Sequence, residues 1–104
     1  YPREDRERDP LMTRRLLRSS AFLRRAKGVF RKRPQAAQDL QSALELLATD
    51  CFHTRLKTHK LKGELEGSWA CSAGCDTRIV FNFVEHEGSE AILLLSLGTR
   101  EEVY

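Results

Sequence analysis

The spacing of apolar residues changes near the middle of the chain, and this change constrains the fold more than any other feature. Apolar residues recur at helical spacing through two segments, Phe22 to Phe30 and Ala36 to Leu47. From Ser68 onward they fall instead in short runs bounded by glycine and polar turn residues, as strands do. Consecutive helices followed by consecutive strands favour an α+β layer structure.

Two amphipathic helices are predicted on either side of Pro34. Ser19 or Ser20 can cap the first helix, because a serine hydroxyl accepts hydrogen bonds from the free amides of a helix start. The outer face of this helix is cationic and carries Arg24, Arg25, Lys27 and Arg31. Gly28 lies inside it and costs about 1 kcal/mol relative to alanine, which tertiary packing can outweigh. Pro34 suits the first turn of the second helix, so the two form a hairpin.

Four strands are expected around this hairpin. They are centred on Leu16 and Leu17, and on the ranges 68–72, 77–84 and 91–97, with the last two joined by a polar turn at 86–90. The expected fold is therefore α+β, with the order β-α-α-β-β-β and a two-helix hairpin packed on one face of a small, mainly antiparallel four-stranded sheet. The strand at 91–97 is apolar on both faces, as a central strand would be.

Strand alternation also assigns side chains to faces. In the strand from Thr77, the residues Ile79, Phe81 and Phe83 share one face, which we expect to pack against the helices. Arg78 is then directed to the opposite face. His59, Lys60 and Lys62 are expected on the loop that precedes the sheet.

Length and composition indicate one domain in the reducing interior of a cell. The chain has 104 residues, and we expect a flexible charged extension at 1–11 and a single domain at 12–104. No apolar run reaches the roughly 18 residues that cross a bilayer. Cysteines occur at Cys51, Cys71 and Cys75, an odd number, so we expect reduced thiols and a cytoplasmic protein.

Charge is strongly segregated along the chain. No acidic residue occurs between Met12 and Arg33, where nine basic residues lie, and none occurs in the second basic cluster from His53 to Lys62. Such clusters favour a polyanionic partner, although a solvated basic helix face is the alternative. The residues expected to bind RNA or the ribosome are Arg24, Arg25, Lys27, Arg31, Lys57, Lys60 and Lys62.

The order of these segments resembles the RelE/ParE toxin superfamily, whose members are small bacterial toxins of toxin–antitoxin pairs. The matching pieces cover most of the chain after Met12: the 22–33 helix, the runs LKTHKLKG at 56–63 and DTRIVF at 76–81, and the final GTREEVY. The chain departs from many members in its SWACS strand, which lacks their lysines or histidine, and in ending its last strand with Arg100 where many have histidine.

The resemblance implies an mRNA interferase, an endoribonuclease that cleaves mRNA, often on the ribosome, by attack of the ribose 2′-hydroxyl on the adjacent phosphate. No metal or other cofactor is implied, and the expected partners are a cognate antitoxin protein, mRNA and the ribosome. Arg78 and Arg100 suit the charge that builds on the phosphate. His59 suits proton exchange, and Tyr104 suits stacking on a base or orienting the hydroxyl.

Other readings of the same residues stay open. The chain resembles the ParE branch as well, whose members act by binding DNA gyrase without catalysis, and a degenerate member that only binds its antitoxin and regulates transcription also fits. Arg78 can pair with Asp76 or Glu85, Tyr104 can pack at the chain end, and His59 can be an ordinary loop histidine. Trp69 is expected to pack at the sheet edge, with stacking on RNA as its alternative. Cys71 and Cys75 lack the four ligands of a structural zinc site.

Overall fold

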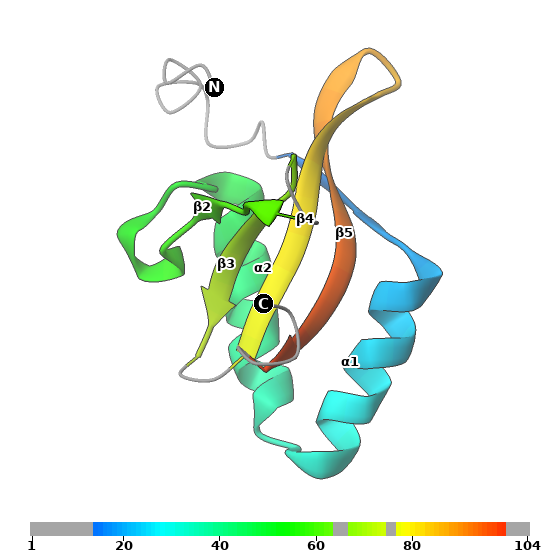
Figure 1. Cartoon of the computed structure of the whole chain (residues 1–104), viewed down its shortest axis with the longest axis vertical. Helices are drawn as coiled ribbons and strands as arrows, with labels where there is room; N and C mark the ends of the chain where they lie inside the picture. Colours follow the sequence, from blue (N-terminus) through cyan, green and yellow to red (C-terminus); the bar gives the residue numbers. More distant parts are fainter. Residues whose placement is uncertain (1–13, 64–66, 75–76, 100–104) are drawn as a thin grey trace.

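The structure is a computed structural model, and it describes residues 14–63, 67–74 and 77–99. Figure 1 shows a curved sheet with α2 behind it and α1 beside the strand β5. The elements in chain order are β1 (Arg15–Arg18), α1 (Ser20–Lys32), α2 (Ala36–Thr49), the short 3-10 helix η2 (Thr54–Leu56), β2 (His59–Lys60), β3 (Trp69–Ala73), β4 (Thr77–His86) and β5 (Ser89–Thr99).

The described residues form one five-stranded sheet in the order β1-β5-β4-β3-β2. β1 runs parallel to β5, and the other neighbouring pairs are antiparallel. β5 lies between β1 and β4, which confirms the prediction that the strand apolar on both faces is central. Two helices on a mainly antiparallel sheet confirm the α+β class.

The expected number of four strands was wrong. His59 and Lys60, placed on a loop by the sequence, form the edge strand β2, and they pair with Ala70 and Trp69 of β3. A strand of two residues with exposed side chains has no hydrophobic alternation that could reveal it. The turn is also shorter than the predicted 86–90, because β4 continues to His86 and β5 begins at Ser89, which leaves Glu87 and Gly88 as the turn.

The β4–β5 hairpin closes through a two-residue turn whose backbone suits its sequence. Glu87 has φ 53° and Gly88 has φ 79°, and positive φ at both central residues is the type I′ geometry that matches the twist of a hairpin. The tip is tied to the start of β1 by ion pairs from Arg15 to Glu87 and from Arg14 to Glu90, each 3.3 Å long.

Both helices pack as their sequences predict, but only α1 begins where expected. Pro34 was expected in the first turn of α2, and it lies outside this helix, because residues 34 and 35 form the turn between the helices and α2 begins at Ala36. The Ser19 hydroxyl accepts a 3.1 Å hydrogen bond from the Phe22 amide and so caps α1. The largest fully buried side chains in the core between helices and sheet come from both layers, and include Phe22, Leu47, Ile79, Phe81, Ile92, Leu94 and Leu97. Ile79, Phe81 and Phe83 all contact this core, which confirms the face predicted for them. Within the described ranges, no helix has the length and apolar character needed to span a membrane.

Candidate active site on the open face of the sheet

The sheet face opposite the helices, here called the open face, carries two of the predicted catalytic residues. In Figure 1 this face is turned toward the reader, because α2 lies behind the sheet. Arg78 pairs with Ser72 in one row of the register, and two rows away His59 pairs with Ala70, which pairs with Val80. Since these residues alternate with core residues along their strands, Arg78 and His59 share the open face.

His59 and Arg78 lie on strands separated by β3. Two strand spacings amount to about 10 Å, so the two side chains flank the surface of β3 and do not compete for one position. An extended nucleotide segment laid across β3 can therefore meet an imidazole on one side and a guanidinium on the other. These are the two groups that a 2′-hydroxyl attack requires, one to exchange a proton and one to stabilise the charged phosphate.

The imidazole of His59 is oriented by the turn between η2 and β2. His59 Nδ1 lies 3.0 Å from the carbonyl oxygen of Lys57. A carbonyl oxygen only accepts hydrogen bonds, so Nδ1 carries the proton and Nε2 is the basic nitrogen of the neutral ring. Lys57 has φ 52°, a left-handed conformation that turns the chain at the end of η2.

Arg78 is half-buried on β4, and part of its guanidinium is anchored. Its Nη1 donates a 3.1 Å hydrogen bond to the carbonyl oxygen of Thr77. A guanidinium has five N–H donors in a planar fork, the geometry that binds a phosphate with two donors. The Ser72 hydroxyl beside it in the register is a polar group that the sequence analysis did not assign to the site. A serine in a strand has no periodic signal that distinguishes it from a surface residue.

Between the two candidate catalytic residues the open face is apolar. Leu61 is 8% exposed and packs with the buried residues Ala70 and Val80, and Leu95 joins this small cluster. The Leu61 amide donates to the Ser68 carbonyl oxygen at 2.9 Å, which extends the pairing of β2 with β3. The segment after β2 thus folds over one end of the open face and leaves Lys62 exposed at its margin.

Lys60 does not share the open face with His59. Its Nζ lies 5.5 Å from the ring centre of Trp69, over the aromatic face, as in a cation–π contact. Trp69 itself packs edge-on against Phe52 and Phe83, with ring centres 5.5 Å and 5.4 Å away. The prediction that Trp69 packs is therefore confirmed, although β3 is not the sheet edge, because β2 pairs with its outer side. Lys60 lies on the helix side of the sheet.

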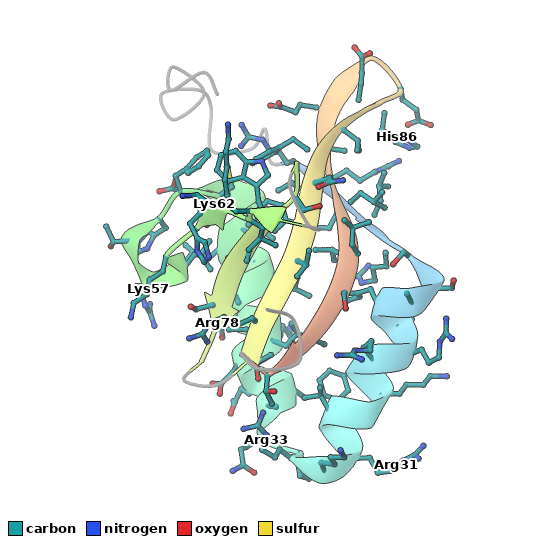
Figure 2. The ribbon with its side chains drawn as sticks, viewed as in Figure 1. Arg31, Arg33, Lys57, Lys62, Arg78 and His86 are labelled. Carbon is teal, nitrogen blue, oxygen red and sulfur yellow. The ribbon has the colours of Figure 1, made fainter. Side chains whose placement is uncertain are left out.

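The basic residues form two separate surfaces. Figure 2 shows Lys57 and Lys62 near β2, whereas Arg31 and Arg33 lie at the other end of the molecule, where α1 ends. Arg24, Arg25, Lys27 and Arg31 are exposed along α1, which packs beside β5. Arg33 lies near the end of β4 that carries Arg78, because its Nη2 donates a 3.5 Å hydrogen bond to the Thr77 hydroxyl.

Two predicted catalytic residues, Arg100 and Tyr104, lie outside the described residues, as do Cys75 and Asp76. The last described residue of β5, Thr99, pairs with Thr77, next to Arg78. The roles assigned to Arg100 and Tyr104 therefore stay predictions.

The thiols of Cys51 and Cys71 are buried in the core and are free. Burial raises the pKa of Cys71 to about 12 and also raises the pKa of Cys51. Both thiols are therefore protonated near pH 7, a form that neither attacks nor ligates metals. In the part of the chain that the structure describes, no three His, Cys, Asp or Glu side chains cluster as metal ligands would.

The described fold is that of bacterial toxins of the RelE/ParE kind, as a comparison with solved structures shows. YafQ from E. coli strain BL21(DE3) superposes with a TM-score of 0.70 at 17% identity, over 88% of this chain and 98% of that one. A YoeB/ParE toxin from Agrobacterium tumefaciens gives a TM-score of 0.68 at 13% identity, over 83% and 98% of the two chains. The resemblance read from the sequence is thus confirmed at the level of the fold.

Two further solved structures extend the comparison. The E. coli DinJ–YafQ toxin–antitoxin complex matches with a TM-score of 0.68 at 17% identity, over 88% of this chain and 97% of that one. A metal-bound toxin from Helicobacter pylori matches with a TM-score of 0.68 at 23% identity, over 86% and 98%. No protein-family model and no curated protein sequence matches the chain.

Proposed function

We propose that this protein is the toxin of a toxin–antitoxin pair and acts in the cytoplasm as a metal-independent endoribonuclease on mRNA, with the ribosome as a further partner. The observation that supports this most is the register that puts His59 and Arg78 on one open face, in a fold shared with YafQ and YoeB/ParE toxins. The proposed site includes Arg100 and Tyr104, which follow β5 in the sequence.

In the proposed reaction the ribose 2′-oxygen attacks the adjacent phosphorus. The bond between the 2′-oxygen and phosphorus forms while the bond to the 5′-oxygen breaks, which gives a 2′,3′-cyclic phosphate and a 5′-hydroxyl. His59 Nε2 accepts the proton of the 2′-hydroxyl, and a water molecule gives a proton to the departing 5′-oxygen. Arg78 and Arg100 stabilise the charge on the phosphoryl oxygens, since guanidinium groups stay charged and hold phosphate with two donors. Tyr104 stacks on a neighbouring base.

An antitoxin is the proposed protein partner. The DinJ–YafQ complex is a toxin–antitoxin assembly of a protein with this fold. The cationic face of α1 suits an acidic or amphipathic segment of such a partner. Expression of the protein alone tests the toxin role: growth should stop and cellular mRNA should be cut, and co-expression of the antitoxin should restore growth. Normal growth with intact RNA in cells that contain folded protein contradicts the proposal.

A further inference from the structure

A second basic site lies where α1 meets the end of β5. A cavity of about 350 Å³ opens between them, and it is lined by Arg24, Arg25, Gly28, Lys32, Arg33 and Thr99 over an apolar floor of Val29 and Leu97. We call it the α1–β5 pocket. None of the described residues that line it is acidic. A concave site with four cationic side chains and a hydroxyl has the chemistry that binds a phosphate group.

Gly28 has no packing reason to be a glycine. Arg24, Gly28 and Lys32 follow one another at i, i+4 and i+8, so they form one stripe of α1 with the glycine between two cations. A Cβ at Gly28 would meet no atom within 4 Å, and its φ is not positive. Glycine destabilises a helix interior, so the fold alone would favour a larger residue there. The missing side chain keeps the pocket open and its helix backbone accessible.

Two of the pocket cations are positioned by the sheet. Arg25 Nε donates a 2.8 Å hydrogen bond to the carbonyl oxygen of Leu97 in β5. Arg33 Nη2 donates toward the Thr77 hydroxyl at 3.5 Å. Held guanidiniums lose less conformational entropy on binding than mobile ones do. This distinguishes the pocket from the outer face of α1, where Lys27 and Arg31 are exposed and do not line it.

The pocket also adjoins the candidate active site. Thr99, which lines the pocket, pairs with Thr77, and the next residue along β4 is Arg78 on the open face. The pocket therefore lies at the same end of the sheet as Arg78, on the side of the sheet that α1 covers. Figure 2 shows this neighbourhood, with Arg33 below the lower ends of the strands and Arg78 above it.

We propose that the α1–β5 pocket binds a second backbone phosphate of the RNA whose scissile phosphate is held at Arg78. The inference rests on the proposed function only in taking RNA as the polyanion. A phosphodiester fits better than a carboxylate partner, because the pocket offers several guanidinium and ammonium donors to one small volume and adjoins a face suited to nucleotides.

The first test fills the pocket without changing charge. Gly28→Gln adds a neutral side chain between Arg24 and Lys32, and Ala21→Gln adds the same side chain at an exposed position of α1 outside the pocket. Affinity is measured for a 2′-O-methyl oligoribonucleotide, which a 2′-hydroxyl mechanism cannot cut. Gly28→Gln should weaken binding by about 10-fold, because the added side chain obstructs the phosphate between Arg24 and Lys32. It should raise Tm by a few degrees, because a glycine is removed from a helix interior. Ala21→Gln should bind as the unaltered protein does.

The second test removes charge in matched pairs. The double variant R24Q/K32Q loses two pocket cations, and K27Q/R31Q loses two cations of the same helix outside it. The slope of log affinity against log salt should fall by about one in the pocket variant, since the single phosphate bound there releases about one counterion. The outer-face variant should change it less.

Two results would overturn the proposal that the pocket binds an RNA phosphate. One is equal weakening by both double variants together with unaltered binding by Gly28→Gln, which means that α1 acts only as a diffuse charge. The other is an affinity for polyglutamate as high as the affinity for RNA, with the same loss in Gly28→Gln. That result would mean that the pocket binds an acidic protein. The oligonucleotide cannot be cleaved, so this test measures binding alone. A failure of the proposed reaction can therefore be distinguished from a failure of the pocket proposal.

Discussion

Arg78 of β4 lies beside Ser72 of β3, on the face of the sheet that the helices leave uncovered. If its guanidinium stabilises charge that appears only in the transition state, Arg78→Ala should lower the single-turnover cleavage rate by about 10²- to 10³-fold. RNA affinity should fall far less, because the ground-state phosphate loses only one of several contacts. Arg100→Ala should behave in the same way.

The matched control for Arg78 lies on α1. The double variant K27Q/R31Q should weaken RNA binding and its salt dependence with little change in the rate of bound RNA. Both variants are compared at saturating RNA. An unchanged rate in Arg78→Ala and in Arg100→Ala would favour a protein that binds its target without cutting it.

The His59 imidazole should matter for rate through Nε2. General acid–base groups contribute typically 10² to 10⁴ in rate, so His59→Ala should slow cleavage by about 10²-fold or more. His53→Ala is the control, because the His53 Nδ1 accepts a 3.1 Å hydrogen bond from the Arg55 amide and serves to cap η2. Equal rates for the two variants in a single-turnover assay argue against proton exchange by His59.

Trp69 should contribute to stability and not to RNA binding. Its edge-on contacts with Phe52 and Phe83 place it in the packed layer, and truncating a packed Trp costs about 3–5 kcal/mol in the free energy of unfolding. Denaturant unfolding of Trp69→Ala measures this loss, and Trp69→Phe should lose less. A stable Trp69→Ala protein that no longer binds RNA would mean that the ring stacks on bases instead.

The buried thiol of Cys71 should make the folded protein less stable at alkaline pH. Its pKa is raised by burial from 9.0 to about 12, so the folded state keeps a proton that the unfolded state releases above about pH 9. The stabilisation is complete below the unfolded pKa and is lost as pH rises from about 9 to 12. Tm measured across this window should fall less steeply in Cys71→Ala than in the unaltered protein. Parallel curves would contradict the assignment.

The sequence predicted elements wherever periodicity extended over several residues. The Ser19 cap, the two helices and the face of Ile79 and Phe81 follow from local spacing, and the structure confirms them. The strand β2 was not predicted, because two exposed residues are too few to show a hydrophobic alternation. The register shift between Val80 and Phe81 also has no sequence signal.

The candidate site was less predictable because it joins distant segments. Alternation assigned Arg78 to the open face, but the position of His59 two strands away depends on the pairing of β2 with β3. The contact of Arg25 with Leu97 joins residues 72 positions apart, and no local pattern encodes such a pair. From the sequence, Gly28 could be interpreted only as a residue that destabilises its helix. Its place in the lining of the pocket is known only from the structure.

The chemistry of the cut RNA end tests the central claim most directly. Purified protein is incubated with a ribosome-free RNA in the presence of a chelator, and the new ends are analysed beside those from an Arg78→Ala preparation. The account predicts cleavage that survives chelation, leaves a 2′,3′-cyclic phosphate and a 5′-hydroxyl, and falls by about 10²-fold or more with Arg78→Ala. Where cleavage requires ribosomes, the ends alone decide. Products that carry a 3′-hydroxyl contradict it, since that end comes from metal-assisted hydrolysis.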